Sequence, residues 1–205
     1  RGMFSGTDQK DYNSQLKYSK ANIRANIDFE VTPTTLMQVN MMASFIETNE
    51  PSAGNANDIF YQVYRLPATA FPIQTPDGIW GGNQNYTDAN PIARIQGTGY
   101  EKTHQRALYA DARLTQRFDF ITKGLSASVR MGYDNFSRLN EEHSKTFQYG
   151  YVYYTDKIGD PSNSESVIYG DKINSLSYGS WLGNQYRSSH FDVSVDYERQ
   201  FGDHG

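Results

Sequence analysis

The sequence contains no cysteine, no excess of basic residues and no long apolar run, and each absence excludes a class of protein. Without cysteine no disulfide can form, so a small disulfide-stapled scaffold is excluded. The formal net charge of -4 and the pI near 5.5 provide no basic surface, which argues against nucleic acid as a partner. No apolar stretch approaches the roughly 20 residues that a membrane-spanning helix needs.

The low mean hydropathy of -0.72 does not by itself identify a soluble protein. A transmembrane β-barrel alternates lipid-facing and lumen-facing residues, so its average hydropathy stays low. The chain opens with residues 1–7 (RGMFSGT), which contain no apolar signal segment. We therefore expect either a cytoplasmic protein or a piece of a longer chain.

The clearest pattern in the sequence is an alternation of apolar and polar residues with a period of two. Between Ala21 and Val31 every odd position is apolar and every even position is polar. Residues 37–45 repeat the pattern after a short turn, interrupted at Met42. Both predicted strands exceed the usual 5 or 6 residues. Further alternating segments predict three more long strands, at residues 105–118, 125–133 and 191–197.

The connections between these strands are of two kinds. Residues 32–35 and 120–124 are short turns, whereas residues 47–103 and 137–186 are long loops, the latter beginning in a loop expected at 135–144. The long loops contain a predicted helix at 58–65 and a hairpin of residues 147–153 with 166–173. Alternating short and long connections are typical of an outer-membrane barrel, with the long loops outside the cell.

Five strands cannot close such a barrel, because single-chain bacterial barrels begin at about eight strands. The predicted fold class is therefore all-β: an antiparallel segment of an incomplete transmembrane β-barrel, with five spanning strands and one extracellular hairpin. A chain end at residues 202–205 (GDHG) is expected to be a turn.

A proline-rich segment of residues 66–82 (LPATAFPIQTPDGIWGG) stands out inside the first long loop. Its three prolines exclude a helix interior or a central strand. Its large apolar side chains argue against disorder, so we predict a folded cap. The triplet Pro76-Asp77-Gly78 predicts a tight turn within it.

Three segments resemble the barrel of SusC/RagA-type TonB-linked outer-membrane transporters. They are residues 23–35 (IRANIDFEVTPTT), the proline loop at 65–73 and 76–82 with Asn90-Pro91, and residues 197–204 (YERQFGDH). The resemblance covers nearly the whole chain in the same order, and the proline loop is its most specific part.

The resemblance implies a 22-stranded barrel in the outer membrane of a Gram-negative bacterium, occluded by an N-terminal plug. It also implies TonB-driven import of oligosaccharides or peptides, with a SusD-like surface lipoprotein closing the outer mouth, and no cofactor. These 205 residues are then expected to be an early-to-middle part of the barrel wall. The plug, the TonB-interacting segment and the remaining strands would belong to a longer protein.

Eight loop residues are candidates for contact with a substrate or with the lid. Aromatic rings can stack on sugars, but they also pack loops together or form the aromatic girdle of a barrel. Charged loop residues can bind a ligand, but most are simply solvated. The aromatic candidates are Trp80, Tyr149, Tyr151, Tyr153 and Trp181, and the charged ones are Arg65, Asp77 and Arg94.

Two other classes of protein are alternatives to a transporter. In a secreted carbohydrate-binding β-sandwich the same apolar faces would meet across a dry core, but the strands would be shorter. A glycan-cleaving enzyme needs two opposed carboxylates, and the adjacent Glu141 and Glu142 make a poor pair. The four histidines lack metal-ligand spacing, so neither an enzyme nor a metal site is expected.

Overall fold

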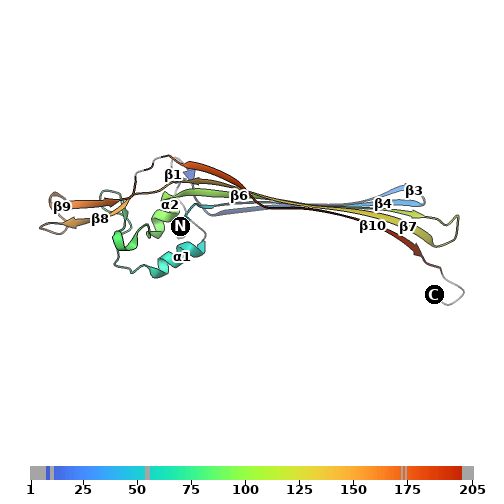
Figure 1. Cartoon of the computed structure of the whole chain (residues 1–205), viewed down its shortest axis with the longest axis horizontal. Coiled ribbons are helices and arrows are strands. Elements are labelled where there is room, and N and C mark those ends of the chain that lie inside the picture. The colour runs from blue at the N-terminus through green and yellow to red at the C-terminus, as the bar shows by residue number, and fades with distance from the viewer. Residues whose placement is uncertain (1–7, 10–11, 54–55, 172, 174, 200–205) are drawn as a thin grey trace. The chain divides into compact units, whose positions relative to one another are not determined.

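The computed structural model describes residues 8–9, 12–53, 56–171, 173 and 175–199, and it is mostly β (Figure 1). The expected turn at 202–205 and residues 200–204 of the third resembling segment lie outside the described residues. The structure confirms the all-β class.

Five long strands form one open sheet with the order β10-β7-β6-β4-β3. Because strands that follow each other in the chain are also neighbours in the sheet, the sheet is an antiparallel meander. In the described part of the chain β3 and β10 are the edge strands. The bounds are Lys17–Thr32 for β3, Thr35–Pro51 for β4, Gly99–Arg117 for β6, Leu125–Ser144 for β7 and Ser177–Tyr197 for β10.

The smaller elements lie between these strands in the chain. β5 pairs in parallel with β8, and β8 pairs antiparallel with β9, with Tyr151 opposite Val167, which confirms the predicted hairpin. The two-residue strands β1 and β2 pair with each other. The bounds are Asp8–Gln9 for β1, Tyr12–Asn13 for β2, Trp80–Gly81 for β5, Tyr149–Tyr154 for β8 and Ser164–Tyr169 for β9. The helices are α1 (Ala56–Arg65), η1 (Gln84–Tyr86), α2 (Pro91–Gly97) and η2 (Pro161–Asn163).

The long strands extend further than the alternation predicts. β7 continues to Ser144, so the loop expected at 135–144 is wrong, and the long connections narrow to residues 52–98 and 145–176. The added residues of β7 contain only two apolar side chains, Phe136 and Leu139, so no regular alternation of apolar and polar residues marks them. Directly after β7 ends, Lys145 N donates to the Thr98 carbonyl at 2.9 Å. Helix α1 also begins two residues before the predicted start.

The chain forms two compact units, and the five long strands contribute residues to both. Unit 1 comprises Arg1–Tyr18, Glu47–Thr103 and Asn140–Trp181. Unit 2 comprises Ser19–Ile46, His104–Leu139 and Leu182–Gly205.

Unit 2 is a single layer of sheet that leaves its apolar side chains exposed. Ile23, Val31, Phe191, Val193 and Val195 are between 59% and 70% exposed. Among the described residues of this unit only Gly132 is buried. A sheet normally buries one face against another element, so the apolar face of unit 2 lacks the cover that a soluble domain would give it.

The other face of unit 2 carries polar side chains that bond to one another across the strands. Asn40 donates to Asp111 at 3.3 Å, and Arg130 Nε lies 3.7 Å from the same carboxylate. On neighbouring strands the hydroxyls of Ser128 and Ser194 are 2.8 Å apart. The alternation seen in the sequence therefore separates an apolar surface from a hydrogen-bonded polar one.

Unit 1 has a small core of its own. Ile59 of α1 and Ala93 and Ile95 of α2 are almost fully buried, and the two helices pack against each other (Figure 1). In the part of the chain that the structure describes, no helix is long and apolar enough to cross a membrane.

Candidate functional site

The proline loop is organised around the buried side chain of Asn90, which is 2% exposed. Its Oδ1 accepts hydrogen bonds from the backbone N–H groups of Ile92 (3.1 Å) and Ala93 (3.2 Å), which caps α2. Its Nδ2 donates to the carbonyls of Ile73 (2.9 Å) and Gly81 (3.0 Å). One side-chain amide thus joins the start of α2 to two separate segments of the loop.

Two glycines allow the backbone of this loop to pass close to its neighbours. A Cβ on Gly81 would lie 1.6 Å from the Pro72 carbonyl oxygen, and one on Gly82 would lie 2.6 Å from the ring of Tyr149. The Gly82 N–H donates to the Gly150 carbonyl at 2.9 Å. A side chain at Gly81 would therefore disturb the fold of the proline loop itself, whereas one at Gly82 would disturb its packing on Tyr149 of β8.

The tight turn predicted at Pro76-Asp77-Gly78 is present. Gly78 has φ +81 and its N–H donates to the Thr75 carbonyl at 2.9 Å. Ser166 of β9 donates its hydroxyl to the Asp77 carboxylate at 2.8 Å. The turn is therefore tied to the hairpin β8–β9, although the two segments are far apart in sequence.

Beside this scaffold, unit 1 contains an open cavity of about 500 Å³. Its walls carry charges of both signs, hydroxyl groups and two aromatic rings. It is lined by Ser52, Ala53, Asp88, Arg94, Thr98, Glu142, Ser144, Lys145, Thr146, Phe147, Tyr149, Gly170 and Asp171.

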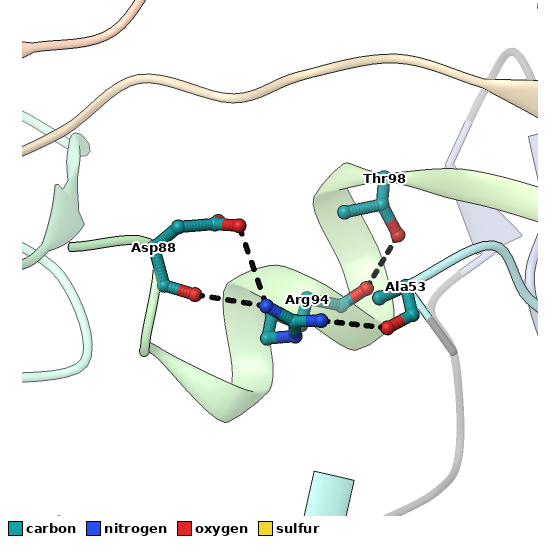
Figure 2. Close-up of polar contacts among 4 residues, drawn as sticks. All are labelled: Ala53, Asp88, Arg94 and Thr98. Atoms are coloured by element: carbon teal, nitrogen blue, oxygen red, sulfur yellow. Dashed lines mark hydrogen bonds and ion pairs between the residues drawn. The ribbon is translucent and has the colours of Figure 1, made fainter. Parts of the chain in front are cut away.

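Arg94 is held rigidly in one wall of the cavity (Figure 2). Its Nη1 donates to the side chain and to the carbonyl of Asp88, both at 3.3 Å, and its Nη2 donates to the Ala53 carbonyl at 2.8 Å. Thr98 donates its hydroxyl to the Arg94 carbonyl at 2.6 Å. Burial raises the pKa of the Asp88 carboxyl above its usual value, and the neighbouring Arg94 guanidinium partly offsets this rise.

Glu142 and Lys145 supply the opposite charges of a second wall. Glu142 Oε1 accepts a hydrogen bond from the Ser52 hydroxyl at 2.7 Å. The Lys145 ammonium lies 4.9 Å from the centre of the Tyr12 ring, a cation–π contact. Because the Lys145 N–H is bonded to Thr98, the backbone that carries this lysine is fixed at the end of α2.

The aromatic wall of the cavity belongs to Phe147 and Tyr149. Phe147 packs on α2, where a Cβ added to Gly97 would come within 3.2 Å of it. Tyr149 stacks on Tyr169 with 5.6 Å between ring centres. Further along β8 the Tyr153 hydroxyl donates to Glu165, and this hydrogen bond raises the pKa of Tyr153.

The structure brings together six of the eight predicted contact residues. Trp80, Tyr149, Tyr151 and Tyr153 lie on the three-stranded sheet, which the Asp77 turn contacts, and Arg94 shares the cavity with Tyr149. Of the eight residues, only Arg94 and Tyr149 line the cavity. Arg65 lies over the Tyr61 ring at 5.1 Å, beside a separate hollow of about 310 Å³, and Trp181 is 44% exposed on β10.

Sequence reasoning did not identify Asp88, Lys145 or Asp171 as cavity residues, and it considered Glu142 only as half of an acid pair. Lys145 and Asp171 sit in connections without any motif, and Glu142 fell in an expected loop. Their only signal would have been the continuation of β7, which places Glu142 near the end of that strand, where it lines the cavity.

No known protein-family model matches the chain, and no curated protein matches it either. Among the described residues, no group of three or more histidine, aspartate or glutamate side chains is placed to hold a metal ion.

Proposed function

We propose that the chain is part of the barrel wall of a TonB-dependent outer-membrane transporter of the SusC/RagA type. Such a transporter imports oligosaccharides or peptides together with a SusD-like lipoprotein. The observation that carries the proposal is the single-layer sheet of unit 2, with an exposed apolar face and a hydrogen-bonded polar face.

The exposed apolar face favours lipid as its surroundings. Leaving apolar surface in water costs about 25 cal/mol for each Å², and residues such as Val193 and Val195 are mostly exposed. A bilayer removes that cost. The polar face, with Asp111 and Arg130 in contact, suits a wet lumen.

The lengths of the strands support the same proposal. Within unit 2 the five strands cover residues 19–32, 35–46, 104–117, 125–139 and 182–197. Each exceeds the roughly 9 to 11 residues with which a tilted strand crosses a bilayer. The two turns inside unit 2 are short, whereas the long connections belong to unit 1, as in barrels whose outer loops are long.

The proline loop supports the family named in the proposal. The resembling residues Asn90, Gly81 and Gly82 each have a defined structural role in the loop, Asn90 through its hydrogen bonds and the two glycines through the close approach of their neighbours. Contacts with TonB, the plug and the lipoprotein would involve the longer protein as well.

Spin labelling of the full-length protein in outer membranes tests the proposal. The chain contains no cysteine, so Val193→Cys and Ser194→Cys each give one labelling site in these residues. We expect the label at 193 to be relaxed by oxygen, which dissolves in hydrocarbon, and the label at 194 by a water-soluble nickel chelate.

Each alternative gives a different result. In a β-sandwich the label at 193 would be shielded from both reagents, because it would lie in a dry core. If the nickel chelate relaxed the label at 193 as strongly as the label at 194, both faces would be in water and the proposal would be overturned.

A further inference from the structure

We propose that the cavity of unit 1 is a binding site for a ligand that carries a positive and a negative group, and that its ligand class is a short peptide with free ends. The choice of an imported peptide rests on the proposed function. The cavity itself is defined by unit 1 alone.

The size and walls of the cavity suit a small flexible ligand. Its volume of about 500 Å³ falls within the range of roughly 300 to 1,000 Å³ that ligand pockets occupy. Phe147 and Tyr149 offer an apolar surface for a side chain, and both rings are fixed from behind by α2 and Tyr169. The site is therefore formed before a ligand arrives.

The group that would receive a ligand carboxylate is Lys145. Arg94 is already paired with Asp88 and bonded to Ala53, so its charge is compensated within the wall. The Lys145 ammonium contacts the face of the Tyr12 ring, which takes up none of its three N–H donors as conventional hydrogen bonds.

The group that would receive a ligand ammonium is Glu142. The Ser52 hydroxyl occupies one of the roughly four acceptor positions of this carboxylate and fixes its orientation. Asp171 adds a second negative charge to the lining. Positive and negative receiving groups thus share one cavity, and a peptide with free ends presents the complementary pair.

A neutral oligosaccharide fits this charge pattern less well. Binding would remove water from Lys145 and Glu142, and hydroxyl groups would return only neutral hydrogen bonds. Charge-assisted hydrogen bonds are roughly twice as strong as neutral ones. The charges of the walls therefore favour a peptide among the two cargo classes left open by the sequence.

Calorimetric titration of the full-length protein in detergent tests the inference with four probes. They are trialanine with free ends, its N-acetylated form, its C-amidated form, and neutral maltotriose. We expect trialanine to bind most tightly and each blocked form to bind about tenfold more weakly, the loss of one charge-assisted contact. Maltotriose should bind more weakly than the blocked peptides.

Two variants assign the charges to residues. Lys145→Gln should weaken trialanine about tenfold and abolish the difference between the free and the amidated C-terminus. Glu142→Gln should do the same for the acetylated N-terminus. Lys157→Gln is the matched control, because Lys157 is exposed in the β8–β9 connection and does not line the cavity.

The inference is overturned if blocking either end leaves the affinity unchanged, or if maltotriose binds as tightly as trialanine. It is also overturned if Lys157→Gln weakens binding as much as Lys145→Gln. If the titrations contradict the inference but the spin labels behave as expected, only the peptide site is rejected and the transporter proposal stands. If the peptide binds as expected but the label at position 193 is exposed to water, the transporter proposal is rejected and the peptide site stands.

Discussion

Units 1 and 2 share five strands but are stabilised in different ways. All the buried apolar and polar side chains of the described residues, among them Ile59, Ile95 and Asn90, belong to unit 1. Unit 2 exposes both faces of its sheet. Unit 1 thus has a hydrophobic core of its own, whereas the sheet of unit 2 has none. This difference explains why particular residues define the proline loop of unit 1, while a simple alternation of apolar and polar residues defines the strands of unit 2.

The largest expected effect is at Gly81, where unit 1 has no space for a side chain. Gly81→Ala would place a Cβ 1.6 Å from the Pro72 carbonyl, which can be relieved only by moving the backbone. We expect local destabilisation of about 4 kcal/mol, above the usual cost of overpacking. Hydrogen exchange of the backbone amides at 73–75 and 77–82 measures it. Gly179→Ala, with no atom within 4 Å, is the control, and equal exchange in both variants would contradict the close packing.

A second test of unit 1 compares two asparagines that each accept two backbone N–H groups. Asn90 is buried and donates to two carbonyls, whereas Asn83 is half-buried and donates to one. Asn90→Ala leaves buried groups unpaired, so we expect a loss of about 3 kcal/mol, against about 1 kcal/mol for Asn83→Ala. Local opening free energies from hydrogen exchange provide the measurement. Similar losses at the two sites would show that burial does not set the cost.

The same contrast explains what the sequence alone can and cannot predict. The five strands were predictable because the alternation at residues such as Ile23 and Val193 gives each strand one apolar and one polar face. The ends of β7 and β10 were not, because their few apolar residues, such as the adjacent Trp181 and Leu182, do not alternate regularly with polar ones. The cavity was not predictable either, since it brings Glu142 and Lys145 beside a helix about fifty residues earlier. The alternation of apolar and polar residues carries no information about such contacts between segments that are distant in sequence.

In unit 2 a substitution tests the surroundings of the sheet. Under the proposed function Val193 faces lipid, so Val193→Arg should destabilise the assembled protein by about 2 kcal/mol, the lower part of the range for a cation inside a bilayer. Ser194→Arg, one residue along on the polar face, should cost much less. Unfolding in lipid vesicles with denaturant measures both. Equal costs would mean that the two faces share one environment, and the contrast with unit 1 would lose its explanation.

The smallest expected effect concerns two carboxylates of unit 1 whose pKa values move in opposite directions from 3.8. Burial raises the pKa of Asp88, so its folded form holds a proton more tightly than the unfolded chain does. Its contribution to stability therefore falls as the pH rises from 3.8 through the folded pKa. Hydrogen bonds from Ser162 lower the pKa of Asp160, so its contribution is complete above 3.8 and is lost as the pH falls through the folded value.

Carbon NMR titration of the two carboxyl groups, assigned with Asp88→Asn and Asp160→Asn, measures these directions. We expect Asp88 to titrate above 3.8 and Asp160 below it. The effects on stability will be small, because solvent screens the half-exposed Asp88 and the carboxylate of Asp160. If Asp88 titrated below 3.8, its ion pair with Arg94 would outweigh burial, and this wall of the cavity would be more solvated than the rest of unit 1 indicates.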